Sequence, residues 1–191
     1  MKKSLGAKTL LYPTPLVVVG TYNKEGRPNI MTAAWTGIVC SQPPSASVSL
    51  REQRLTYDNL LHHRAFTLSI PSEKYAAECD YAGMVSGRTQ DKFAQAGLTP
   101  VKAEHVDAPY VKEFPMVLEC RLQKTIDIGA HIQCVGEIIN VLAEESVLGE
   151  NGLPDMEQVK PVIYAPETGL YYATGRLLGE AFSIGEKFTE K

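Results

Sequence analysis

The chain has 191 residues, of which 44% are hydrophobic and 21% charged, a composition typical of one globular domain with a single core. The formal net charge of −3 argues against a nucleic-acid-binding protein, because such proteins usually present a basic face. No apolar run approaches the roughly 20 residues of a membrane helix. We therefore expect a cytoplasmic protein with neither nucleic-acid nor membrane partners.

Short runs of β-branched residues predict four strands in the first part of the chain. They cover residues 16–21, 29–35, 45–50 and 65–70, and the turn residues 23–27 separate the first two. Their close spacing favours antiparallel pairing.

Three helix starts are predicted from capping residues. Thr56 is expected to cap a helix that has Asp58 in its first turn, and Ser72 is expected to cap a second. Thr89 is expected to cap a third, short helix that ends at Gly97.

The clearest strand signal lies later in the chain, where apolar and other side chains alternate from residue 116 to residue 123. The face expected toward the core is Met116, Leu118, Cys120 and Leu122, and the opposite face is Val117, Glu119, Arg121 and Gln123. Gly129 marks a turn, and residues 131–142 are the expected antiparallel partner. These elements predict a mainly β, antiparallel barrel with helical excursions (α+β). No Gly-x-Gly-x-x-Gly motif supports a parallel nucleotide-binding sheet.

The four cysteines lack Cys-x-x-Cys spacing, and no His pair has i, i+4 spacing, so we expect no metal site. Reduced, mostly buried thiols are expected instead, Cys40 included.

The octapeptide Ser-Gly-Arg-Thr-Gln-Asp-Lys-Phe at residues 86–93 places hydroxyls, a glycine and two cations at a helix start. Free N–H groups and positive charge at such a turn favour a phosphate. Taken alone, the octapeptide favours an ordinary solvated turn and helix cap over a phosphate site.

Together with residues 29–44, the strand-like residues 45–50 and the block 51–56, this octapeptide resembles the flavin reductase-like family, whose fold is the FMN-binding split barrel. Within that family the likeness is closest to the flavoredoxins, and it extends from about residue 15 to residue 172. The resemblance implies one domain over residues 1–191, with a core at about 12–172 and a C-terminal extension at 173–191.

The resemblance also implies which residues bind FMN. Thr56, Ser86, Gly87 and Lys92 would serve the phosphate and ribityl end. The residues expected at the ribityl chain or the ring are Asn29, Met31, Thr32, Trp35, His131 and Tyr164. Ser49 and Arg51 are expected at the ribityl chain or the phosphate. His131 is also the catalytic candidate, tuning the flavin or positioning a hydride donor. The residues alone leave structural interpretations open for three of these positions. Trp35 could be a core residue, Lys92 a solvated charge and His131 a structural hydrogen-bonding residue.

The implied activity is an FMN-dependent oxidoreductase that takes hydride from NADH or NADPH. The alternatives are an electron-transfer carrier with a redox protein partner and a flavin-binding module without turnover. A homodimer is expected, because the family builds its flavin sites beside a subunit interface. The apolar segments at residues 10–12 and 170–172 add modest support.

Overall fold

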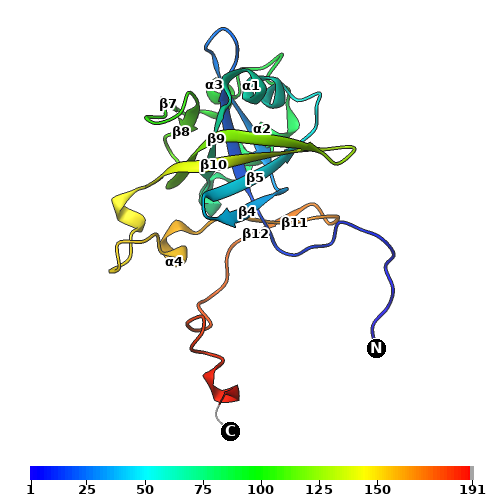
Figure 1. Ribbon diagram of the computed structural model, residues 1–191, viewed down its shortest axis with the longest axis vertical. Coiled ribbons are helices and arrows are strands. Elements are labelled where there is room, and N and C mark those ends of the chain that lie inside the picture. Colours follow the sequence, from blue (N-terminus) through cyan, green and yellow to red (C-terminus); the bar gives the residue numbers. More distant parts are fainter. Residues whose placement is uncertain (190–191) are drawn as a thin grey trace.

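The computed structural model describes residues 1–189, which form a mainly antiparallel β body with short helices packed around it (Figure 1). The strands are β1 (Thr14–Pro15), β2 (Val17–Tyr22), β3 (Pro28–Ala33), β4 (Thr36–Ser41), β5 (Pro44–Leu50), β6 (Ala65–Ile70), β7 (Pro100–Lys102), β8 (Pro109–Val111), β9 (Met116–Asp127), β10 (Ile132–Ala143), β11 (Ile163–Ala165) and β12 (Leu170–Tyr172). The α-helices are α1 (Leu55–His63), α2 (Ala76–Met84), α3 (Lys92–Ala96) and α4 (Met156–Val159), and the 3₁₀ turns are η1 (Glu73–Tyr75), η2 (Glu145–Val147) and η3 (Glu186–Phe188).

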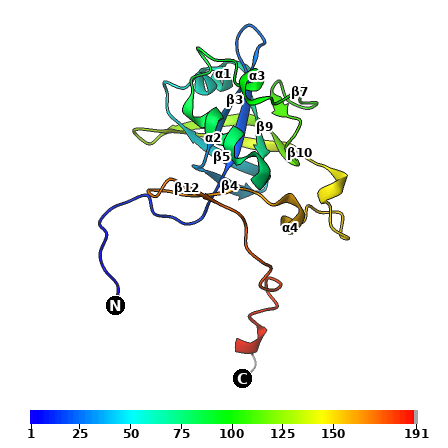
Figure 2. The ribbon, with the colours of Figure 1, turned by 180° about the vertical axis from the view of Figure 1, so that it is seen from behind.

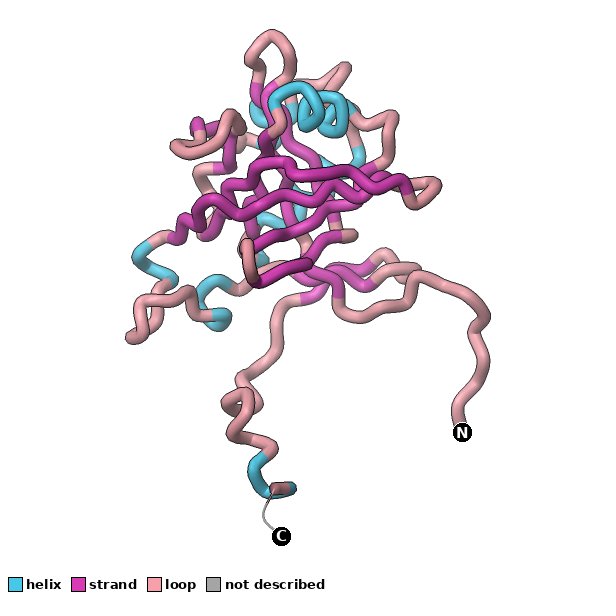
Figure 3. Tube along the Cα trace, in the orientation of Figure 1, coloured by secondary structure: helices cyan, strands magenta, loops and turns pink. Residues whose placement is uncertain are grey.

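The main sheet has seven strands in the order β3-β2-β6-β9-β10-β5-β4. Its two edge strands, β3 and β4, are separated in sequence only by Ala34 and Trp35. Three peptide steps reach at most about 11 Å, so the sheet must curl until its opposite edges meet. The Ser49 backbone N–H donates to the Trp35 carbonyl at 2.8 Å, which ties β5 to this connection. We call the connection formed by Ala34 and Trp35 the seam. Figure 3 shows the strands running in two crossing directions, as this curling requires.

The sheet is covered on both of its faces. Val17 and Val19 point into the barrel core with Phe66 and Leu68. Leu16 and Val18 pack outside it in a second cluster, against residues of α2 and α3. Because β2 is apolar on both faces, it reads in the sequence as a continuous β-branched run.

The predicted strands correspond to β2, β3, β5, β6, β9 and β10, with bounds shifted by at most a few residues. β4 was not predicted. Most of its side chains are exposed, so no buried period marks it in the sequence.

Two predicted helix caps are wrong. α1 begins at Leu55 after Arg54, and the Thr56 hydroxyl instead accepts a hydrogen bond from the Asn29 amide. α3 is capped by Asp91, whose carboxylate accepts from the Ala94 N–H at 3.0 Å, rather than by Thr89. Tertiary contact decides the first case, and a carboxylate closer to the helix decides the second.

Two other helix-end predictions gave mixed results. Gly97 ends α3 in the left-handed region at φ 65°, as predicted. Ser72 lies before η1, but its side chain makes no capping bond. The helical segment after Ser72 begins with the 3₁₀ turn η1, which continues directly into α2.

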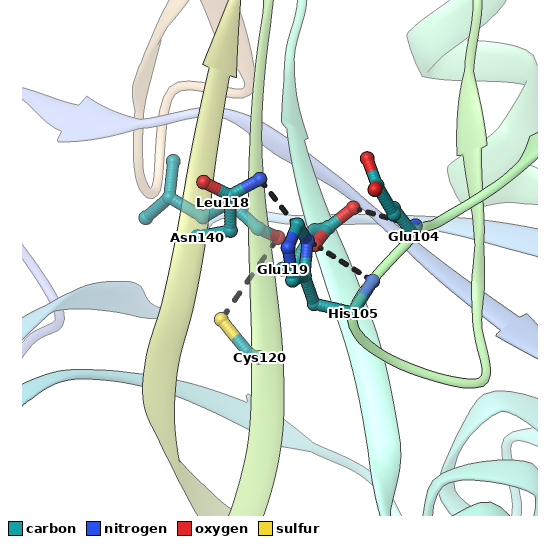
Figure 4. Close-up of polar contacts among 6 residues, drawn as sticks. All are labelled: Glu104, His105, Leu118, Glu119, Cys120 and Asn140. Atoms are coloured by element: carbon teal, nitrogen blue, oxygen red, sulfur yellow. Dashed lines mark hydrogen bonds and ion pairs between the residues drawn. The ribbon is translucent and has the colours of Figure 1, made fainter.

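Glu119 corrects the predicted pattern of β9, because its side chain is fully buried instead of facing solvent. Its carboxylate accepts from the backbone N–H groups of Glu104 at 3.0 Å and His105 at 3.2 Å. The His105 Nδ1 donates to it at 2.8 Å (Figure 4). These donors come from a loop folded over β9. The alternation in sequence gave no sign of that loop.

A small second sheet, β1-β11-β12, brings the two chain ends together. The Tyr12 hydroxyl donates to the Pro166 carbonyl at 2.9 Å. Beyond this sheet, the N-terminal arm and the C-terminal residues extend from the same end of the body (Figures 1 and 2). Within residues 1–189, no helix has the length and apolarity needed to cross a membrane.

Candidate functional site

A cavity of about 330 Å³ opens at the seam of the barrel. Seven of the twelve predicted site residues line it: Met31, Thr32, Trp35, Ser49, Arg51, His131 and Tyr164. Ala33, Ala34, Leu50 and Arg54 complete the lining. These residues come from parts of the chain more than a hundred positions apart.

Strand pairing explains why they meet. The β5 residue Leu50 pairs with Ile132 at the start of β10, which places His131 next to Arg51. Thr14 of β1 pairs with Tyr164, so the small sheet supplies the far wall.

Residues of β3 line one side of the cavity. The Met31 side chain points into the barrel core. The Thr32 hydroxyl donates to the carbonyl of Cys79 on α2. Both side chains are therefore engaged elsewhere in the fold.

The lining is positively charged. Arg51 and Arg54 supply this charge, and His131 adds to it only when it is protonated. Burial and the nearby Arg51 guanidinium lower the pKa of His131 from 6.5. Such a site favours a ligand that carries negative charge, because the ligand would offset repulsion already present.

Asn29, Thr56 and Gly87 form a second group that does not line the cavity. The Asn29 amide Nδ2 donates to Thr56 Oγ1 at 3.0 Å, and both side chains are buried. A Cβ on Gly87 would lie 2.0 Å from the Asn29 Oδ1. Only glycine therefore allows the 86–87 loop to approach this pair so closely.

Lys92 is buried at the start of α3, which excludes the solvated-charge interpretation. Its Nζ donates to the Ala82 carbonyl at 2.7 Å, its one hydrogen-bond acceptor within residues 1–189. Burial, and secondarily Arg54, lower the pKa of Lys92 to about 8. A buried ammonium with so few partners is a candidate to bind an anion.

Arg54 is the residue that sequence reasoning missed. It lines the cavity, and its charge acts on Lys92, so it connects the cavity to that buried ammonium. Its place in the 51–56 block was the available signal.

Two further side chains are exposed to solvent. Ser86 is exposed, and its Oγ accepts from the Arg88 N–H at 3.2 Å. Cys40 on β4 is also exposed, so the expectation of a buried thiol there was wrong, whereas Cys79, Cys120 and Cys134 are buried.

Comparison with known proteins identifies the fold and the family. Residues 9–177 match the family described as "Flavin reductase like domain". The solved flavoredoxin of Desulfovibrio vulgaris (Miyazaki F) is 57% identical, with a TM-score of 0.94, over 97% of this chain and 100% of that one. An FMN-binding protein from Thermus thermophilus, solved with bound 1-cyclohex-2-enone, is 26% identical with a TM-score of 0.79, over 94% of this chain and 97% of that one.

A relative of known sequence is an uncharacterized protein from Archaeoglobus fulgidus. It is 31% identical over 148 residues, which cover 76% of this chain and 80% of that protein. The predicted split-barrel fold and the predicted resemblance are confirmed, and the chain belongs to the flavin reductase-like family.

Proposed function

We propose that the chain is an FMN-binding oxidoreductase that passes electrons from NADH, NADPH or a redox protein through the bound flavin. The observation that carries this proposal is the positively charged cavity at the seam, linked by Arg54 to the buried Lys92. The FMN-binding protein from Thermus thermophilus, which shares the fold, supports the choice of cofactor.

The residues present suit an aromatic cofactor with one phosphate. Trp35, His131 and Tyr164 give the cavity aromatic walls that can contact a flat ring. Lys92 and the Asn29–Thr56 pair, with Gly87 against it, offer donors for a phosphate.

Bound FMN would supply the redox chemistry, accepting hydride or electrons and releasing them to an acceptor. The protein would contribute charged side chains at fixed positions around the cofactor. A phosphate dianion beside Lys92 would raise the lowered pKa of that ammonium and keep it protonated. Arg51 and a protonated His131 would stabilise negative charge that develops on the reduced cofactor.

An electron carrier without a nicotinamide site is the second candidate. The observation in its favour is the resemblance to a flavoredoxin over nearly the whole chain. The two candidates share the flavin site, and they differ in whether a nicotinamide delivers hydride to it.

Two measurements test the proposal in sequence. Purified protein is incubated with FMN or FAD, desalted, and its absorbance spectrum recorded; we expect flavin bands with FMN. Retention of neither flavin would refute the function outright. NADH or NADPH is then added without oxygen. Bleaching by either supports the reductase, and bleaching by neither, with dithionite still effective, supports the carrier.

We also propose that the protein is a homodimer. The two apolar segments at residues 10–12 and 170–172 are both connected to the same small sheet, because β1 pairs with β11, β11 pairs with β12, and the Tyr12 hydroxyl donates to the Pro166 carbonyl. Leu11, Tyr12, Leu170 and Tyr172 expose their side chains at this place. Sedimentation at micromolar concentration would show a single species of monomer mass if the dimer does not form.

A further inference from the structure

The C-terminal segment 173–189, here called the tail, carries large apolar side chains that are mostly exposed to solvent. Leu178 is 78% exposed and Phe182 is 99% exposed. The remaining exposed apolar residues of the tail are Leu177, Ile184 and Phe188. The tail's one hydrogen bond to the body within residues 1–189 runs from the Leu177 N–H to the Glu157 carboxylate.

Strands β4 and β12 lie at the end of the body where the tail leaves it (Figures 1 and 2), and both carry exposed apolar side chains. Ile38 is 69% exposed and Val39 is 47% exposed on β4, and Leu170 and Tyr172 are exposed on β12. β4 is also an edge strand, paired with β5 and with no other strand among the described residues. An apolar, unpaired edge of this kind is normally covered.

Most of the tail is included in the match to a solved protein. The match to the flavoredoxin of Desulfovibrio vulgaris covers 97% of this chain, which leaves only about six of 191 residues outside it, fewer than the tail contains. A terminal segment that is matched along most of its length in a related structure is more consistent with a docked arm than with a free end.

We propose that the tail of each subunit docks on the surface formed by β4 and β12 of a second copy of the chain. The chain supplies both an apolar arm and an apolar surface that this arm does not reach within one molecule. A two-fold axis satisfies both at once, because each subunit gives its tail and receives the other. This inference builds on the proposed homodimer and names the segment that holds it together.

Docking there would also border the cofactor cavity. Trp35 directly precedes β4, and Tyr164 of β11 pairs with Tyr171 of β12. The partner's tail would therefore lie beside two walls of the cavity.

The first experiment compares three full-length variants by sedimentation at a series of concentrations. Leu178→Glu/Phe182→Glu changes the tail, and Ile38→Glu changes the receiving surface. Leu61→Glu is the control, since Leu61 is 39% exposed on α1, away from this surface. We expect the first two to weaken dimerisation at least tenfold and the control to leave it unchanged. A tail variant that dimerises as tightly as the wild type would overturn the proposal.

The second experiment asks whether a second copy covers the tail. Trypsin can cut after Arg176 and Lys187, which lie in the tail. Cleavage should slow as the protein concentration rises through the dimer dissociation constant. Cleavage at a rate independent of concentration would mean that no second copy protects the tail.

A double-mutant cycle of Phe182→Ala and Ile38→Ala then measures coupling across the interface. Strict additivity would place the tail elsewhere than β4. FMN retention, measured separately on each variant, keeps a failure of this inference distinct from a failure of the proposed function.

Discussion

Lys92 and Glu119 are the two charged residues buried most completely in the described chain, and their surroundings are opposite. The Glu119 carboxylate has three hydrogen-bond donors from the 104–105 loop, one of them an imidazole. The Lys92 ammonium has one carbonyl, and Arg54 repels it. A buried charge with a full set of partners holds the fold together, whereas one with a deficient set is available to a ligand.

The largest effect is expected when the hydrogen bonds to the Glu119 carboxylate are broken. Glu119→Gln keeps the side-chain volume but removes the charge and turns an acceptor into a donor that faces other donors. We expect a loss of about 2–4 kcal/mol in the free energy of unfolding. Denaturant unfolding measures it. Glu104→Gln, an exposed neighbour on the same loop, is the control and should be near neutral.

Lys92→Met tests whether the poorly partnered Lys92 ammonium serves a ligand and not the fold. The free energy of unfolding should change by less than about 1 kcal/mol, because the substitution removes a buried charge that has only one hydrogen-bond partner. FMN affinity should fall by about 1.5–3 kcal/mol if the ammonium binds the phosphate. Fluorescence titration with FMN gives the dissociation constant, and Lys74→Ala, at an exposed lysine, serves as control. An unchanged constant, with stability reduced as much as in Glu119→Gln, would assign Lys92 to the fold.

The protonation state of Lys92 should make both protein stability and FMN affinity depend on pH. The Lys92 pKa of about 8 lies below its ordinary 10.5, so the flavin-free protein loses this proton before the unfolded chain does. This group therefore makes the flavin-free protein more stable as pH rises from about 8 toward 10.5. FMN affinity should move the other way, falling about tenfold per pH unit at most above pH 8. Titrations on either side of pH 8 check this, and Lys92→Met should abolish the slope.

His131, whose imidazole is partly exposed, should give the smallest effect. Its pKa is lowered from 6.5, so it is charged only in acid. His131→Ala should lower the flavin midpoint potential there by on the order of 20 mV and leave it unchanged at higher pH. Potentiometry with His62→Ala as control measures it. An equal shift at every pH would mean that His131 acts by packing and not by charge.

The sequence predicted the strands well wherever burial imposes a period. β6 was predicted with its observed bounds, because Phe66, Leu68 and Ile70 alternate with Thr67 and Ser69. β4 was missed, because an exposed edge strand has no such period. Capping was predicted worst. The hydroxyl of Thr56 binds a side chain 27 positions away, which no local rule can foresee.

The site was predictable as a set of residues but not as an arrangement. Trp35, Arg51, His131 and Tyr164 were selected through the family resemblance, and the structure brings them into one cavity. Their separation from Asn29, Thr56 and Gly87 depends on barrel closure, which is a long-range property. Neither the burial of Lys92 nor that of Glu119 could be read from the alternation of neighbouring residues.

The seam gives the protein a built-in optical reporter. Trp35 is the only tryptophan in the chain, and it lies both in the connection that closes the barrel and in the cavity wall. Its ultraviolet emission will therefore respond to whatever occupies the cavity, and flavin absorbs in the wavelength range of that emission. Opening of the seam would change the solvent around the same indole and shift its emission to the red. One unlabelled fluorophore can thus follow both ligand arrival and barrel opening in real time.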